Sequence, residues 1–272
     1  MGALTPLVLE AVRFGYGSER VLDGLSLRVE AGEGVALLGA NGAGKTTLTR
    51  LAMALRHPQQ GRVVTCGRLT AGKKPEDFAD VAGYLFQNPE AQLFARTVRA
   101  EVAFGPERMG WHPPRVMEAV DRVLGELGLA SDAARHPYDL PGPTRRLVAL
   151  AAALVGSPRL LILDEPTAGL DRGARVRVAE VVLALRAQGA AVLAVTHDLG
   201  FAAEVLDRAV VLEGKRVTRD APLSALLGHH PDFPAPPLLD LARRLGLEGV
   251  RPAIGTLAPL LTSPPETGTL QA

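Results

Sequence analysis

The most restrictive feature of this sequence is an eight-residue loop between an apolar run and a helical stretch. Residues 39–46 read Gly-Ala-Asn-Gly-Ala-Gly-Lys-Thr and fit the pattern G-x-x-x-x-G-K-[ST]. The apolar run 35–38 precedes the loop, and a stretch of helical period reaches residue 55. Glycines are needed because side chains would keep the backbone N–H groups from wrapping a phosphate, and the helix N-terminus adds a positive dipole end. The segment therefore predicts a phosphate-binding loop in an α/β fold.

The lysine and the threonine that end this loop have separate expected roles. Lys45 is expected to bridge the β- and γ-phosphates of a nucleotide, and Thr46 to hold Mg²⁺ through its hydroxyl. ATP and Mg²⁺ are therefore the expected cofactors. The residues of this segment expected to bind the nucleotide are Gly39, Asn41, Gly42, Ala43, Gly44, Lys45, Thr46 and Thr47.

Polar residues also follow three other apolar runs. Asp164 and Glu165 come directly after the run 160–163, and two buried carboxylates cost on the order of several kcal/mol unless a cation or a reaction compensates. Asp164 is expected to ligate Mg²⁺, and Glu165 to act as the general base on the attacking water. Gln87 is expected to ligate Mg²⁺ and sense the γ-phosphate, while His197 is expected to bind that phosphate and stabilise the transition state.

The order of apolar runs predicts the fold class and the domain organisation. Runs 35–38, 81–86, 160–163 and 191–195 are apolar at consecutive positions, as expected of central strands in a mostly parallel sheet. Segments 7–14 and 25–29 alternate polar and apolar residues and predict an antiparallel portion. We expect a domain over 1–220 with a helical insertion at about 88–158, where Val116, Val120, Leu124 and Leu127 share one helical face. A proline-rich extension over 221–272 is expected to hold one helix, at 238–247.

Charge and composition exclude several classes of protein. Thirty basic and 29 acidic residues give a net charge of +1, so no basic field indicates nucleic acid as a partner. Cys66 is the only cysteine, which is typical of a reducing compartment, and residues 1–14 show no signal-peptide pattern. The longest apolar run, 147–155, is about half of the roughly 20 residues that a membrane helix needs. Contact with a membrane is therefore expected only through a partner.

The order of these motifs resembles that of the ABC ATPases. Tyr16, the 39–46 loop, Gln87, the segment 140–144, Asp164 with Glu165, the segment 168–171 and His197 together cover residues 7–213. The resemblance implies that Tyr16 stacks on adenine and that Asp171 belongs to a loop that communicates across a head-to-tail dimer. In such a dimer each ATP lies between the phosphate loop of one subunit and the signature helix of the other.

Within that family the sequence is similar to the energy-coupling factor ATPases, through residues 87–94 and 102–106. This similarity implies uptake of a metal ion or vitamin, with the chain peripheral at the cytoplasmic face of the membrane. The implied partners are an integral membrane scaffold and a substrate-binding membrane subunit. Leu93 and Phe94 have the alternative role of packing the insertion onto the sheet.

The signature segment, residues 140–144, departs from the family pattern. Where the family reads Leu-Ser-Gly-Gly-Gln, residues 140–144 read Leu-Pro-Gly-Pro-Thr. Pro141 removes the serine hydroxyl, and neither Pro141 nor Pro143 has an N–H donor. The departure favours a heterodimer with a second ATPase over a homodimer. The alternative function is a non-hydrolysing, ATP-binding scaffold or regulatory subunit, against which Glu165 and His197 argue.

Overall fold

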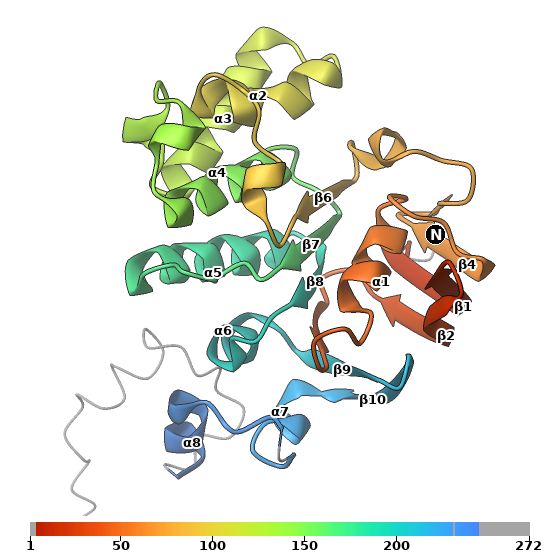
Figure 1. Ribbon diagram of the computed structural model, residues 1–272. Helices are drawn as coiled ribbons and strands as arrows, with labels where there is room; N and C mark the ends of the chain where they lie inside the picture. Colours follow the sequence, from red (N-terminus) through yellow and green to blue (C-terminus); the bar gives the residue numbers. More distant parts are fainter. Residues whose placement is uncertain (1–3, 231, 245–272) are drawn as a thin grey trace, which may run out of the picture.

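The computed structural model describes residues 4–230 and 232–244, which form two sheets with helices around them (Figure 1). The larger, six-stranded sheet has the order β10-β9-β3-β8-β7-β6. Its strands are β3 (Gly34–Leu38), β6 (Ala82–Leu85), β7 (Leu160–Asp164), β8 (Ala191–Val195), β9 (Arg208–Glu213) and β10 (Arg216–Pro222). All neighbouring pairs are parallel except β9 with β10. The predicted mostly parallel core is confirmed.

The predicted antiparallel portion is the smaller sheet, of order β2-β1-β4-β5. It consists of β1 (Leu7–Tyr16), β2 (Glu19–Val29), β4 (Gln60–Thr65) and β5 (Arg68–Leu69). The helices are α1 (Lys45–Ala52), α2 (Val98–Arg108), α3 (Pro113–Glu126), α4 (Gly142–Leu154), α5 (Arg172–Ala187), α6 (Leu199–Val205), α7 (Leu223–Leu226) and α8 (Pro237–Arg244). None of the described helices is long and apolar enough to cross a membrane.

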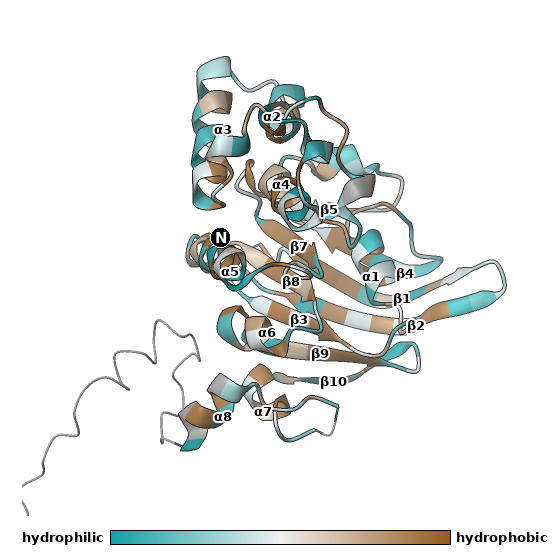
Figure 2. Ribbon diagram, turned by 60° about the vertical axis from the view of Figure 1, so that its left-hand side comes forward, coloured by the Kyte–Doolittle hydropathy of each residue, from teal (hydrophilic) through white to brown (hydrophobic). Residues whose placement is uncertain are grey.

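The main sheet is buried on both faces because its strands are apolar at successive positions (Figure 2). Along β3, Ala36 and Leu38 belong to the cluster under α4, α5 and α6, whereas Val35 and Leu37 belong to the cluster under α1 and the smaller sheet. Successive side chains of a strand point to opposite faces, so an unbroken apolar run supplies both clusters.

One strand lies elsewhere than the sequence predicts. The run 81–86 is expected in the centre of the sheet, yet β6 is its terminal strand. Its residues are all buried, because α4 packs against it and Gln92 covers its end. Gln92 donates to Tyr84 O at 3.2 Å and accepts from Phe86 N at 3.4 Å, as a neighbouring strand would. Because a helix and one side chain cover this edge strand, it is buried like a central strand and is equally apolar.

Helices α2, α3 and α4 gather at one end of the molecule, where the helical insertion is expected (Figure 1). The expected face of Val116, Val120, Leu124 and Leu127 is buried. At the other end of the chain, the expected boundary at residue 220 falls inside β10, which pairs with β9. Helix α8 covers 237–244, and the remainder of the helix expected at 238–247 lies outside the described residues.

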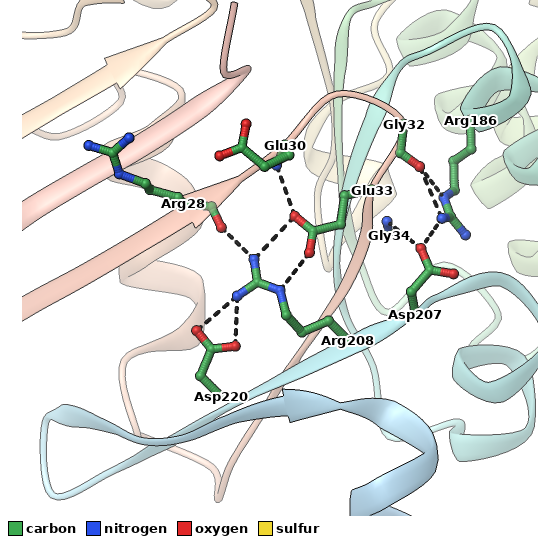
Figure 3. A network of polar contacts seen from close by, with 9 residues as sticks. All are labelled: Arg28, Glu30, Gly32, Glu33, Gly34, Arg186, Asp207, Arg208 and Asp220. Carbon is green, nitrogen blue, oxygen red and sulfur yellow. Dashed lines mark hydrogen bonds and ion pairs between the residues drawn. The ribbon is translucent and has the colours of Figure 1, made fainter. Parts of the chain in front are cut away.

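A network of ion pairs joins the two sheets at the start of β3 (Figure 3). Arg208 on β9 pairs with Glu33 at 2.6 Å and Asp220 at 2.7 Å, and donates to the carbonyl of Arg28 on β2. Beside it, the buried Arg186 of α5 pairs with Asp207. These contacts fix the end of β3 that lies opposite the phosphate loop.

Candidate nucleotide and magnesium site

The predicted site residues meet at one edge of the main sheet. Strands β3, β8, β7 and β6 are parallel neighbours, so the loops that follow them leave from the same edge (Figure 1). The phosphate loop follows β3, Glu165 follows β7, His197 follows β8 and Gln87 follows β6. Open α/β sheets bind ligands at this edge.

Two glycines of the phosphate loop are required by their surroundings. Gly44 precedes α1 with φ of 103°, and a Cβ there would lie 2.9 Å from Cδ2 of Leu22. Gly39 has φ of 139°, and its Cβ would lie 2.3 Å from the carbonyl oxygen of Leu212. Larger residues at these two positions would move the loop away from β9 and β2.

Lys45 extends along this loop. Its Nζ donates to the carbonyl oxygens of Gly39 at 2.7 Å and Ala40 at 3.0 Å, and the residue is only 8% exposed. Burial lowers the pKa of Lys45, while the carboxylates of Glu165 and Asp164 act in the opposite direction. Because a buried ammonium lacks full hydration, a phosphate at this position would stabilise its charged form.

Oxygen ligands suited to Mg²⁺ lie beside the lysine. Thr46 Oγ1 donates to Asp164 Oδ2 at 3.2 Å, and Asp164 is 2% exposed. Burial raises the pKa of Asp164, so a nearby cation would favour its carboxylate form. Magnesium bound with a nucleotide needs only one or two carboxylates because phosphates and waters complete its coordination. The hydroxyl of Thr46, the carboxylate of Asp164 and the amide of Gln87 therefore fit this ion.

Glu165 and His197 approach each other across the ends of β7 and β8. Oε2 of Glu165 accepts weakly from the backbone N–H of His197 at 3.4 Å, and Nε2 of His197 lies 3.5 Å from Oε1. Oε1 is buried and has no hydrogen-bond partner. Glu165 also has φ of 54°, a left-handed conformation held by its N–H bond to Val195 O at 2.8 Å. A carboxylate oxygen without a donor is suited to accept a proton from water.

These side chains line one cavity of about 390 Å³. Its lining includes Tyr16, Asn41, Gly42, Gly44, Lys45, Thr46, Thr47, Gln87, Asp164, Glu165 and His197. Gly39 and Ala43 are not among its lining residues: the carbonyl of Gly39 accepts from Lys45 Nζ, and Ala43 packs against the core. Tyr16 is exposed at the rim, its ring edge-on to Phe14 at 5.1 Å, and a hydrogen bond with Thr47 lowers its pKa. Stacking of Tyr16 on adenine remains a prediction.

The segment 140–144 does not reach this cavity. Pro141 immediately precedes α4, Gly142 and Pro143 form its first turn, and the first bond of the helix runs from Arg145 N to Pro141 O at 3.0 Å. Proline is tolerated there because the first N–H groups of a helix have no intrahelical partner. The first turn keeps the N–H groups of Gly142 and Thr144 and loses that of Pro143. Asp171 caps α5 by accepting from Ala174 N at 2.7 Å.

Sequence reasoning missed Arg146, which connects α4 to the site. Its Nη1 donates to the carbonyl of Glu165 at 2.8 Å, and its Nη2 to that of Gln87 at 3.2 Å. Burial lowers its pKa. The signal in the sequence is a pair of adjacent arginines, Arg145 and Arg146, directly before the apolar remainder of the helix.

Comparison with known proteins defines the class of this fold and site. A profile of the family described as ABC transporter matches residues 22–168. The nickel import ATP-binding protein NikO of Rhodobacter capsulatus is 38% identical over 254 residues, which cover 90% of this chain and 98% of NikO. The cobalt import ATP-binding protein CbiO of Syntrophus aciditrophicus is 39% identical over 215 residues, covering 78% of this chain and 76% of CbiO.

A solved structure agrees with these relatives. The structure of cbiO1 from Clostridium perfringens, described as part of the ABC transporter complex cbiONQ, matches with a TM-score of 0.74 and 26% identity, over 94% of this chain and 99% of cbiO1. Three other relatives, described as putative ABC transporter ATP-binding proteins, are longer, and this chain spans 39%, 27% and 35% of them. The chain belongs to the ABC transporter family, and its fold is that of the ATP-binding cassette.

Proposed function

We propose that this chain hydrolyses Mg²⁺-bound ATP and thereby powers uptake of a small micronutrient through an energy-coupling factor type transporter. In this role Lys45 binds the β- and γ-phosphates, and Thr46, Asp164 and Gln87 hold the metal ion. Glu165 takes a proton from the attacking water, and His197 binds the γ-phosphate. A magnesium ion held by these residues would supply positive charge to offset the charge that develops on the phosphates.

The observation that best supports ATP hydrolysis is the environment of Glu165. Oε1 of Glu165 has no hydrogen-bond donor, and Glu165 lines the same cavity as Lys45 and Thr46. The alternative scaffold that only binds ATP would not need a base at this position. Turnover by the Glu165→Gln variant separates the two functions.

The cargo is inferred from the relatives. NikO is named for nickel import and CbiO for cobalt import, and the former aligns with 90% of this chain. A divalent transition-metal ion is therefore the first cargo to test, with vitamins as the second class. Selectivity would reside in a membrane subunit, since the nucleotide would fill the cavity that Lys45 lines.

Contact with a membrane scaffold is supported by two exposed aromatic rings beyond Gln87. Phe94 is 62% exposed and Phe104 is 44% exposed, and their centroids lie 4.7 Å apart, edge to face. The buried Glu101 holds the turn below them by accepting from Phe94 N at 2.9 Å and Ala95 N at 2.7 Å. Apolar helices of a scaffold at the cytoplasmic face would cover these rings.

A second ATPase is the proposed partner in the dimer. The groups predicted around Lys45 are all present in this chain. The start of α4, by contrast, lacks the serine hydroxyl of the family pattern and has no N–H at Pro143. A lost hydrogen bond to a charged group is worth about 1.5–3 kcal/mol, so the site completed by this α4 would be weak. A partner with an intact signature would complete the site that contains Lys45.

The test is to express the chain with a tag, solubilise membranes and identify the proteins that copurify. We expect a second ATP-binding cassette and integral membrane subunits. Uptake of radioactive Ni²⁺ or Co²⁺ by cells that express the assembled set should depend on Lys45. Uptake that persists in the Lys45→Ala variant contradicts the proposed function.

A further inference from the structure

A buried pair of hydroxyls lies behind the nucleotide cavity, outside every motif described above. Thr49 on α1 is 0% exposed, and Tyr84 on β6 is 7% exposed. Thr49 Oγ1 and Tyr84 Oη are 2.9 Å apart, and Thr49 Oγ1 also donates to the carbonyl of Thr46 at 3.0 Å. Neither Thr49 nor Tyr84 lines the cavity.

The direction of these hydrogen bonds follows from the number of protons. A threonine hydroxyl has one proton, and here it is donated to Thr46 O, so Tyr84 must donate to Thr49. Burial raises the pKa of Tyr84 to about 12, which keeps its phenol a donor at neutral pH. A directed chain of hydrogen bonds therefore runs from β6 through Thr49 to Thr46.

The pair connects two segments that the sheet itself keeps apart. Strand β3, which leads to the phosphate loop, and β6, which leads to Gln87, are separated by β8 and β7. Three strand spacings of about 4.8 Å amount to about 14 Å, so no backbone ladder joins them directly. Helix α1 packs across the face of the sheet, in the same apolar cluster as Tyr84. The Thr49 hydroxyl is the polar contact by which α1 reaches β6.

The end of β6 is fixed on its other side as well. Gln92 bonds the backbone at Tyr84 and Phe86, and the rings of Tyr84 and Phe86 lie 4.3 Å apart. Gln87 directly follows Phe86, so it comes after a strand end that is held on both sides. On α1, Thr46 is tied to Thr49 through its carbonyl while its hydroxyl reaches Asp164.

We propose that the Tyr84–Thr49 hydrogen bond is a positioning contact that sets the spacing between Thr46 and Gln87 and so strengthens Mg²⁺ binding at the nucleotide. The inference rests on the proposed Mg²⁺–ATP site and adds two residues that touch neither ligand. Neither hydroxyl takes part in the chemical step. The Tyr84–Thr49 hydrogen bond affects only how well the phosphate loop and the Gln87 loop hold the same ion.

The experiment measures the gain in nucleotide affinity that the metal provides. Binding of a fluorescent β,γ-imido analogue of ATP to the full chain is titrated with saturating Mg²⁺ and again in EDTA. In Tyr84→Phe we expect the ratio of the two affinities to fall about fivefold, as for the loss of one buried hydrogen bond. Affinity in EDTA should stay unchanged, because the contacts of Lys45 are intact.

Matched variants separate positioning from general damage to the fold. Thr49→Ser keeps the hydroxyl and should behave as the wild type, whereas Thr49→Val should reduce the metal-dependent gain at least as much as Tyr84→Phe does. The double variant Tyr84→Phe with Thr49→Val should be no worse than Thr49→Val, because both remove the same contact. Tyr138→Phe is the control, since it removes a tyrosine hydroxyl that donates to Leu93 O at 3.2 Å, away from the cavity.

The outcomes distinguish this inference from the proposed function. If the wild type shows no gain in nucleotide affinity with Mg²⁺, the proposed site itself is wrong, and the inference with it. If the wild type shows the gain and Tyr84→Phe retains it, only the inference is wrong. Equal losses with Mg²⁺ and in EDTA, or a loss in Tyr138→Phe of the same size, would also overturn it, because they indicate a general structural effect.

Discussion

The guanidinium of Arg146 donates a hydrogen bond of 2.8 Å to the main-chain carbonyl of Glu165. The same side chain donates to the carbonyl of Gln87 at 3.2 Å. Arg146 lies in the second turn of α4, the helix that begins with the altered signature segment. The backbone of the proposed base and that of a proposed metal ligand are thus held by the helical insertion.

We predict that Arg146→Met lowers the rate of phosphate release by about 10- to 100-fold, the range expected when catalytic groups are displaced by about 1 Å. Nucleotide affinity should change little, because Arg146 is not among the residues that line the cavity. Arg146→Lys, which can still donate to one carbonyl, should retain more activity. Steady-state phosphate release and nucleotide titration measure the two effects, and a parallel loss of both contradicts a positioning role.

We predict that Lys45→Ala abolishes Mg²⁺-dependent ATP binding, since no other ammonium lines the cavity among the described residues. The exposed Lys73, in a surface turn, provides the matched control as Lys73→Ala. Isothermal titration with ATP and Mg²⁺ measures the affinity of each variant. Unchanged affinity in Lys45→Ala would show that the nucleotide binds elsewhere.

We predict that Glu165→Gln binds ATP but turns over at least about 100-fold more slowly, as expected for loss of a general base. The amide keeps the shape of the side chain, so an ATP-loaded, closed dimer should accumulate. Size-exclusion chromatography with and without ATP detects the dimer, and phosphate release with the proper partner measures turnover. Near-normal turnover would rule out Glu165 as the base.

We predict that Asp164→Asn is more stable than the wild type without nucleotide at neutral pH. Because the pKa of Asp164 is raised, the folded protein binds the carboxyl proton more tightly than the unfolded chain does. The folded protein is therefore more stable at low pH, and this part of its stability is lost as pH rises through the folded pKa. Removing the charge should raise Tm, and each 1 kcal/mol of added stability corresponds to about 2–4 °C in a chain of roughly this size.

This difference should vanish below about pH 3, where the carboxyl is protonated in both the folded and the unfolded states. Added Mg²⁺ and ATP should reverse the order, because they stabilise the wild type by binding and the variant lacks a metal ligand. Thermal unfolding at pH 7 and at about pH 3 provides the comparison. An Asp164→Asn variant less stable than the wild type at pH 7 contradicts burial as the dominant influence on this carboxyl.

We predict that the chain alone hydrolyses ATP slowly and that a coexpressed partner with an intact signature accelerates it. Replacing Pro141 by Ser, Pro143 by Gly and Thr144 by Gln restores the hydroxyl and the N–H donor, so this triple variant should be more active as a homodimer. Lys45→Ala in the pair should remove most activity. A fast wild-type homodimer, or a pair indifferent to Lys45→Ala, is inconsistent with the heterodimer.

Much of the candidate site is readable from short segments of sequence. The glycines, Lys45 and Thr46 are contiguous, and the chemistry of a loop before a helix N-terminus depends on little else. The apolar runs of β3, β7 and β8 likewise identify buried parallel strands. For β6 the same pattern was misleading, because a covered edge strand and a central strand bury the same side chains.

The sequence by itself determined the phosphate loop, the parallel strands and the acidic pair at residues 164 and 165. Only the tertiary structure decided which distant groups meet: Thr46 with Asp164, 118 positions apart, Gln87 with Arg146, 59 apart, and Thr49 with Tyr84, 35 apart. A motif reports the local backbone conformation and side-chain chemistry that a few adjacent residues require. Hydrogen bonds between elements depend on how helices pack on the sheet, and that packing results from the summed burial of many apolar side chains, none of which marks a partner.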